Sequence, residues 1–249
     1  MHIGRTRFKK DIITEFMLPQ RKDSRKVMIF CSGVPGSPHK DEVLDFWARK
    51  GYWTFFPRYR GTWESGGSFL AHSPHKDLLD VIDGLSSKEK FHDFWGGKNH
   101  QIKPKKIVIV GSSFGGPAAI LASRDPRVDK VVCISPVVDW VAENKADPLD
   151  KLYTFLKDAY GGAYRIQKKD WNKLAQGRFY NPVQHLQELD GRKILILHAK
   201  DDEIVKAKPV IKFAQQTQSQ LVLLNKGGHL SSSMLTLDRY YRKVISFLK

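Results

Sequence analysis

Cysteine is scarce in this sequence, and its scarcity excludes several kinds of protein. Only 2 of the 249 residues are cysteine. Cys31 and Cys133 each end or lie within an apolar run, which indicates small buried side chains rather than a disulfide framework. No group of His and Cys residues has the spacing of a zinc site. We therefore expect neither a metal nor a disulfide scaffold.

Long apolar runs are also lacking. A membrane helix needs about 20 consecutive apolar residues, and no stretch approaches that length. The N-terminal segment MHIGRTRFKKDIITEF is too charged to contain the core of a signal peptide. These two absences predict a cytoplasmic protein that does not bind a membrane.

Acidic residues are outnumbered by basic ones. The chain has 42 Lys and Arg against 26 Asp and Glu, for a formal net charge of +16. Such an excess can indicate a polyanionic partner. However, the basic residues are spread along the chain in short clusters such as RFKK and KPKK, and no nucleic-acid-binding motif accompanies them. The pattern favours a solvated basic surface over a specific nucleic-acid site, with a polyanion-binding protein as an alternative.

Apolar runs alternate with amphipathic segments along most of the chain, which is typical of a mostly parallel sheet covered by helices on both faces. Hydrophobic residues make up 41% of the sequence, enough for one α/β domain spanning residues 1–249. Strands are predicted at 26–31, 52–57, 106–111, 130–135, 193–198 and 220–225, with an antiparallel edge strand at 12–18. Helices are predicted at 40–51, 75–87, 117–125, 207–217 and 234–248.

The segment 140–182 interrupts this alternation. It is rich in aromatic residues and has no strand signal. A loop of such length inside a compact domain is usually functional, so we interpret the segment as a small helical cap inserted into the domain. A plain connecting helix with a long loop is the alternative. Trp171, Tyr160 and Phe179 are expected either to line a substrate pocket or to form the core of the cap itself.

The stretch IVIVGSSFGG carries the first chemical signal. Gly111, Ser113 and Gly115 form the pattern G-x-S-x-G between a predicted buried strand and a predicted helix. The two glycines leave room for a sharp turn that pushes the central side chain outward. A glycine-rich turn without chemistry is the alternative, but the position between strand and helix favours a nucleophile elbow.

Two further polar loops follow predicted strands. Asp201, Asp202 and Glu203 come after the strand at 193–198, and His229 comes after the strand at 220–225. Ligands bind beyond the carboxyl ends of open parallel sheets, so these loops are expected to lie near Ser113. A serine needs a neutral imidazole to take its proton, and the imidazole needs a carboxylate to fix its tautomer. Ser113, His229 and Asp202 can fill these roles.

An oxyanion hole requires two backbone N–H donors. One is expected from Phe114, the residue after the nucleophile, at the start of the following helix. The second should come from the turn SGVPG that follows the strand at 26–31. Pro35 has no N–H, which leaves Val34 as the best donor.

The elbow GSSFGG, the loop AKDDEIV and the loop GGHLSS resemble those of the α/β-hydrolase family, over almost the whole chain. Within that family, PRYRGTWESGGS at 57–68 and SPVVDW at 135–140 are similar to the catalytic domain of prolyl oligopeptidase-type serine peptidases and their esterase relatives. The resemblance implies the α/β-hydrolase fold with an eight-stranded, mostly parallel sheet. It also implies serine acyl transfer without a cofactor, with Ser113, Asp202 and His229 as the catalytic triad.

The resemblance also helps to choose the triad acid among the candidate carboxylates and to compare the oxyanion turn with that of relatives. In the related pattern the acid stands three residues before the valine, here Val205, which selects Asp202. Asp139 is the distant rival, because some hydrolases draw their acid from the preceding strand. Relatives commonly carry His-Gly at the oxyanion turn, where this chain has Ser32-Gly33, so the hole is expected to differ in shape.

We expect hydrolysis of a small-molecule ester, or less favourably of an amide, through an acyl-enzyme intermediate. Nearly all residues are needed for the hydrolase fold, which leaves no room for the propeller of prolyl oligopeptidases and favours an esterase. A peptidase of that type acting on short peptides and a non-catalytic ligand-binding protein on a hydrolase scaffold are the alternatives. Arg58 and Arg60 are expected either to contact an anionic substrate or to form ion pairs. The oligomeric state is not predicted.

Overall fold

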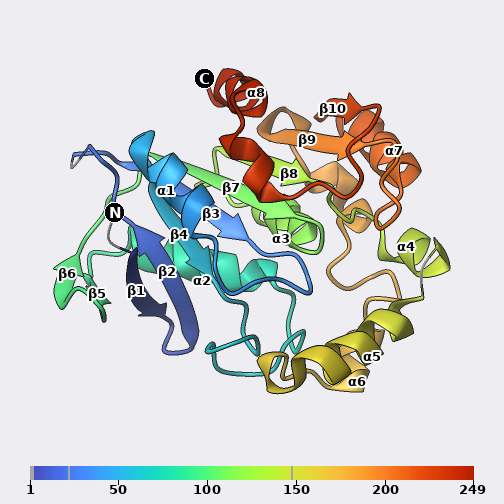
Figure 1. Cartoon of the computed structure of the whole chain (residues 1–249), viewed down its shortest axis with the longest axis horizontal. Helices are drawn as coiled ribbons and strands as arrows, with labels where there is room; N and C mark the ends of the chain where they lie inside the picture. Colours follow the sequence, from blue (N-terminus) through green and yellow to red (C-terminus); the bar gives the residue numbers. More distant parts are fainter. Residues whose placement is uncertain (1–2, 22, 147) are drawn as a thin grey trace.

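The computed structural model describes residues 3–21, 23–146 and 148–249, and an eight-stranded sheet runs through its centre (Figure 1). In spatial order the strands are β1 (Ile3–Phe8), β2 (Ile12–Met17), β4 (Trp53–Pro57), β3 (Lys26–Cys31), β7 (Lys106–Ser112), β8 (Lys130–Ile134), β9 (Ile194–Ala199) and β10 (Gln220–Leu224). The strands from β4 to β10 are parallel, and β2 is antiparallel to both of its neighbours. This is the predicted α/β-hydrolase sheet.

Helices cover both faces of the sheet, as the alternation of apolar and amphipathic segments predicts. The helices are α1 (Asp41–Arg49), α2 (His75–Ser86), α3 (Gly115–Ala122), α4 (Trp140–Ala146), α5 (Leu149–Tyr160), α6 (Lys168–Asn172), α7 (Ala207–Thr217) and α8 (Asp238–Phe247). Short 3-10 turns are η1 (Gly161–Ala163), η2 (Pro182–Glu188), η3 (Gly191–Lys193) and η4 (Ser232–Thr236). Side chains of α1 and α8 share one core cluster, and those of α2, α3 and α7 share the other.

The central strands are buried on both faces, which explains their nearly continuous apolar sequences. In β7 and β8 the β-branched residues pack against helices above and below the sheet. All six parallel strands lie within one residue of the predicted ranges. No helix among the described residues is both long and apolar enough to cross a membrane.

The prediction for 12–18 is wrong in one respect. β2 is antiparallel, as expected, but it is not the edge strand, because β1 pairs along its outer side. β1 reads IGRTRF, and its exposed or half-exposed positions include Arg5 and Arg7. Charged side chains on the solvent face protect an edge strand from pairing with other chains. Because of these charges, the sequence of residues 3–8 did not indicate a strand.

A two-stranded hairpin of β5 (Phe91–Asp93) and β6 (Lys98–His100) was not predicted either. Each strand has three residues, too few for a periodic pattern to be recognised. Phe91 lies edge-on against Phe16, with ring centroids 5.3 Å apart. The hairpin therefore covers the apolar face of the outer strands.

The segment 140–182 contains α4, η1 and the pair α5 and α6, which lie together at one end of the molecule (Figure 1). Trp171 is 1% exposed, and its indole N–H donates to the carbonyl of Leu149 at 2.9 Å. Tyr160 and Phe179 pack on the same core. Of the two roles expected for these three aromatic residues, the structure supports the one within the core. Asp147, inside this segment, lies outside the described residues.

Two arginines after β4 form ion pairs, which is one of the two roles expected for them. The Arg58 guanidinium is 1% exposed and donates to Glu15 Oε1 at 2.7 Å. It also lies 2.9 Å from Glu64 Oε2. Arg60 binds Asp77 at 2.6 Å, together with two other aspartates. These pairs tie the chain beyond β4 to β2 and α2.

We predict that Glu15→Gln lowers the free energy of unfolding by about 3 kcal/mol, because it removes the charge that compensates a buried guanidinium. Glu64 binds the same arginine but its side chain is 46% exposed. Glu64→Gln is the matched control and should cost less than about 1 kcal/mol. Urea unfolding at neutral pH measures both values, and equal losses would contradict the importance of the buried partner.

Candidate active site

Ser113 lies at the sharp turn between β7 and α3. Its φ angle is +52°, in the left-handed region that residues other than glycine rarely adopt. The turn is held by backbone hydrogen bonds, from Ser113 N to the Ile134 carbonyl at 2.9 Å and from Gly116 N to the Ser113 carbonyl at 2.9 Å. The side chain is therefore carried on a strained but fixed backbone, at the carboxyl end of the sheet.

Glycines around Ser113 allow this turn to exist. A Cβ atom on Gly111 would lie 2.3 Å from the Gly115 carbonyl oxygen, and one on Gly115 would lie 2.6 Å from the carbonyl oxygens of Cys31 and Ser32. Both contacts are to backbone, which cannot move aside. The sequence pattern G-x-S-x-G is thus a steric requirement for packing α3 against β7 and the turn after β3.

His229 and Asp202 are brought together by the loops after β10 and β9. His229 Nδ1 lies 2.9 Å from Asp202 Oδ2 and 3.1 Å from Oδ1. The Asp202 side chain is fully buried, whereas that of His229 is 27% exposed. Asp202 also accepts the backbone N–H groups of Ile204 and Val205. Burial alone would raise the pKa of Asp202, but hydrogen bonds from His229, Val205 and Ser135 outweigh it and lower the pKa.

The other acidic candidates have different surroundings. Asp201 is exposed and its carboxylate accepts the backbone N–H groups of Gly228 at 2.9 Å and Gly227 at 3.2 Å. These bonds lower the pKa of Asp201 and hold the loop that leads to His229. Asp139 accepts the N–H of Val141 at the start of α4. Glu203 is exposed.

Ser113 and His229 are not joined by a hydrogen bond in the part of the chain that the structure describes. The structure therefore joins Asp202 to His229 by a hydrogen bond but does not join His229 to Ser113. Catalytic hydrogen bonds are often long in structures without substrate. With Asp202 ionised, Nδ1 of His229 donates to the carboxylate, which leaves Nε2 as the acceptor of the ring.

The two predicted oxyanion donors lie close to Ser113, Phe114 next to it in the chain at the start of α3 and Val34 in the turn after β3. Val34 and Phe114 both line the cavity that contains Ser113. Neither backbone N–H donates to another of the described residues. A Cβ atom on Gly33 would lie 3.4 Å from the Ser113 Cβ, so the turn after β3 passes directly beside the serine. The Tyr180 hydroxyl donates to the Phe114 carbonyl at 2.6 Å, and this bond holds the backbone of Phe114 in place.

A cavity of about 240 Å³ opens at Ser113. Its lining is apolar except for the serine and one carboxyl group, that of Glu143. The lining residues are Val34, Pro35, Ser113, Phe114, Val137, Trp140, Glu143, Leu149, Leu152, Ile204 and Val205. Sequence reasoning did not single out Glu143 or Trp140, although Trp140 belongs to the motif SPVVDW.

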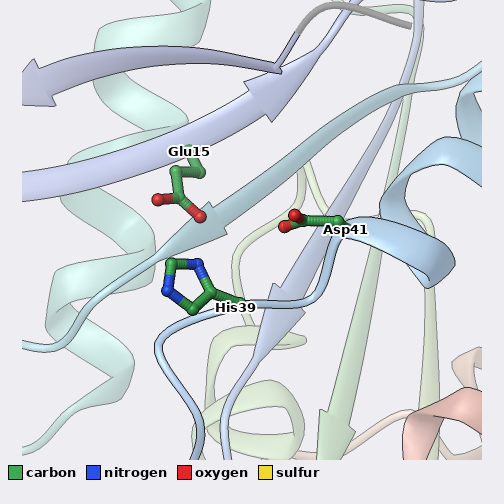
Figure 2. Close-up of side chains that lie close together, drawn as sticks. All are labelled: Glu15, His39 and Asp41. Carbon is green, nitrogen blue, oxygen red and sulfur yellow. The ribbon is translucent and has the colours of Figure 1, made fainter.

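A second group of polar side chains comes from β2 and from the chain at and before the start of α1. Figure 2 shows Glu15, His39 and Asp41 turned toward one another, with one ligand atom of each within 4.8 Å of the others. Glu15 Oε1 already accepts from Arg58 at 2.7 Å and from Arg5 at 3.0 Å. A divalent cation would therefore meet two guanidinium groups bound to the same carboxylate. This charge balance favours a structural role for the cluster over a metal site.

Comparison with known proteins gives a match to one family. The sequence model described as the prolyl oligopeptidase family matches residues 38–249, which include Ser113, Asp202 and His229. No curated protein matches the chain.

Solved structures share the fold at low sequence identity. An esterase of Pyrococcus furiosus is 18% identical with a TM-score of 0.70, covering 99% of this chain and 90% of its own. Est1E of Butyrivibrio proteoclasticus, solved with ferulic acid, is 17% identical with a TM-score of 0.69, covering 98% and 99%. The acylaminoacyl peptidase of Pyrococcus horikoshii is 16% identical with a TM-score of 0.66, covering 99% of this chain but 40% of its own.

The left-handed backbone of Ser113 leads to a stability prediction. Ser113→Gly should have a free energy of unfolding about 1 kcal/mol higher than Ser113→Ala, because glycine adopts this conformation without a steric penalty. Ser112, the last residue of β7, is the matched control, and there alanine should be the more stable substitution. Thermal or urea unfolding of the four variants measures the difference. If alanine is the more stable substitution at both positions, the turn at Ser113 is not strained.

Proposed function

Because the chain belongs to the prolyl oligopeptidase family, a family of serine hydrolases with the α/β-hydrolase fold, we propose that it hydrolyses carboxylic esters through an acyl-enzyme intermediate on Ser113. The observation that carries this proposal is the 2.9 Å contact between His229 Nδ1 and the buried Asp202 carboxylate, at the same end of the sheet as the elbow. A buried carboxylate oriented on an exposed imidazole is the arrangement that activates a neighbouring serine.

The three residues of the proposed triad have distinct roles in the reaction. The Nε2 atom of His229 accepts the Ser113 hydroxyl proton as the oxygen attacks the ester carbonyl carbon. The same proton then passes to the leaving alcohol as the tetrahedral intermediate collapses to the acyl-enzyme. Water, deprotonated by His229, attacks the acyl carbon and releases the acid and free Ser113. Asp202 holds the tautomer and stabilises the imidazolium that forms in each half.

The amides of Val34 and Phe114 are proposed to receive the oxyanion. Both residues line the cavity that contains Ser113, and their N–H groups have no partner among the described residues. Unpaired N–H groups beside a buried turn would cost free energy unless a ligand or water satisfies them. A negatively charged tetrahedral oxygen is the acceptor that such donors stabilise best.

The segment 140–182 is proposed to act as a cap within a single domain spanning 1–249. Four residues of this segment line the cavity beside Ser113: Trp140, Glu143, Leu149 and Leu152. A cavity of about 150 Å³ can hold benzene, so the 240 Å³ here suits one small acyl or alcohol group. Small-molecule esters are the substrates that fit.

Cleavage of short peptides is the second candidate. It is favoured by the family and by the similarity to an acylaminoacyl peptidase, of which this chain spans 40%. Both reactions use the same residues, and they differ only in the leaving group. A non-catalytic ligand-binding protein is the remaining alternative, and the labelling and turnover experiments below test it. The proposal includes no specific nucleic-acid partner and no membrane partner.

We expect Ser113→Ala to abolish covalent labelling by a fluorophosphonate probe and to reduce ester turnover by several orders of magnitude. The variant should remain folded, because the substitution removes one oxygen from a half-exposed site. Ser112→Ala, at the neighbouring buried serine, is the control and should label normally. A panel of para-nitrophenyl esters and aminoacyl amides then separates esterase from peptidase. Labelling that persists in Ser113→Ala would disprove the nucleophile.

Replacement of the two adjacent aspartates separates their roles. Asp202→Asn should lower kcat by roughly three to four orders of magnitude, because the amide stabilises the wrong histidine tautomer. Asp201→Asn should cost about tenfold or less, since an asparagine oxygen can still accept from Gly228. Steady-state turnover of one ester measures both. If Asp201→Asn or Asp139→Asn is the crippling change while Asp202→Asn stays active, the acid is misassigned.

A further inference from the structure

The triad mechanism leaves one titratable group of the cavity unused. Glu143 is the single ionisable side chain among the described residues that line it, and it is 7% exposed. It lies on α4, one turn after Trp140, which also lines the cavity. No Lys, Arg or His within the described ranges forms an ion pair with it.

The charges around Glu143 are mostly negative. The pKa of this carboxyl is raised to about 7, chiefly by burial and also by the carboxylates of Asp202 and Asp139, although the Lys206 backbone N–H and ammonium oppose the rise. Asp202 lies in the loop after β9, and Asp139 directly precedes α4. Acidic groups therefore act on Glu143 from both of these segments. Near neutral pH the cavity thus carries a buried, half-ionised carboxyl group that forms no ion pair with any described residue.

A buried carboxylate without a cation is costly, and its retention at a binding surface indicates a ligand that compensates it. Apolar side chains form the remaining wall, and the indole of Trp140 can stabilise a cation through its ring face. A group with a positive head and an apolar body fits both features. An anionic group would be repelled by the Glu143 carboxylate in the cavity wall.

We infer that Glu143 and Trp140 form a subsite for an ammonium group of the substrate, so that the enzyme prefers esters carrying a positive charge a short distance from the scissile bond. This inference rests on the proposed function, since the subsite adjoins Ser113. It assigns Glu143 to binding and gives it no part in proton transfer. Ionisation of Glu143 sets the strength of the preference, which therefore rises with pH.

Two matched pairs of esters test the inference. One pair is choline butyrate and its carbon isostere, in which a tert-butyl group replaces the trimethylammonium group. The other is the para-nitrophenyl ester of trimethylammonio-butyric acid and its tert-butyl isostere, which places the charge in the acyl half. Neither cation titrates, so the ratio of kcat/KM within a pair cancels the pH dependence of the triad. For at least one pair the ratio should rise about tenfold between about pH 5.5 and pH 8.5.

Glu143→Gln should abolish this rise, because the amide keeps its shape but cannot ionise. Asp139→Asn is the matched control: the rise should remain, with its midpoint at lower pH, since one carboxylate that raises the pKa of Glu143 is gone. A ratio that is flat in the unmodified protein for both pairs, or that still rises in Glu143→Gln, overturns the subsite.

Fluorophosphonate labelling of the same preparations separates this outcome from failure of the proposed function. Normal labelling of Ser113 with a flat ratio overturns the ammonium subsite alone. Absence of both labelling and turnover overturns the proposed function and the subsite with it. Retained labelling with the expected rise and its loss in Glu143→Gln supports both.

Discussion

The close approach of α3 to the ends of β3, β7 and β8 is the constraint on which the candidate site depends. Three glycines make it possible, because a Cβ atom on any of them would lie within 2.6 Å of a neighbouring atom: Gly111 of Gly115, Gly115 of Cys31 and Ser32, and Gly116 of Pro136. This spacing forces Ser113 into a left-handed turn and directs it away from the sheet. It also places the start of α3 beside the turn that carries Val34, so one steric requirement positions both the serine and the two proposed oxyanion donors.

Sequence patterns predicted the parts of the fold that depend on burial and missed those that depend on pairing. The parallel strands were found because burial on both faces makes them continuously apolar. β1 was missed because Arg5 and Arg7, which suit an edge, look like an unstructured charged segment. The order of the strands and the identity of the edge depend on hydrogen bonds between distant segments, and residue composition carries little information about these.

The candidate site shows the same division. The elbow and the two polar loops could be predicted, because each requires particular residue types directly after a strand. That Asp201 holds the His229 loop through Gly227 and Gly228 could not be predicted, since the acceptor of a backbone N–H leaves no pattern in the sequence. Glu143 was missed for a similar reason. It is one of two charged residues in a short helix, and only the packing of α4 near the loop after β9 places it in the cavity.

Net charge and local charge have opposite signs in this protein, and the local charge controls the chemistry. The formal charge of +16 would suggest an anionic ligand. Exposed charges farther than about 8 Å are largely screened at physiological ionic strength, whereas a partly buried carboxylate interacts through a lower effective dielectric. The charged groups that act on Glu143 are the carboxylates of Asp202 and Asp139, opposed by Lys206. The composition therefore describes the solvated surface, and the ligand that lowers the cost of the buried carboxylates is a cation.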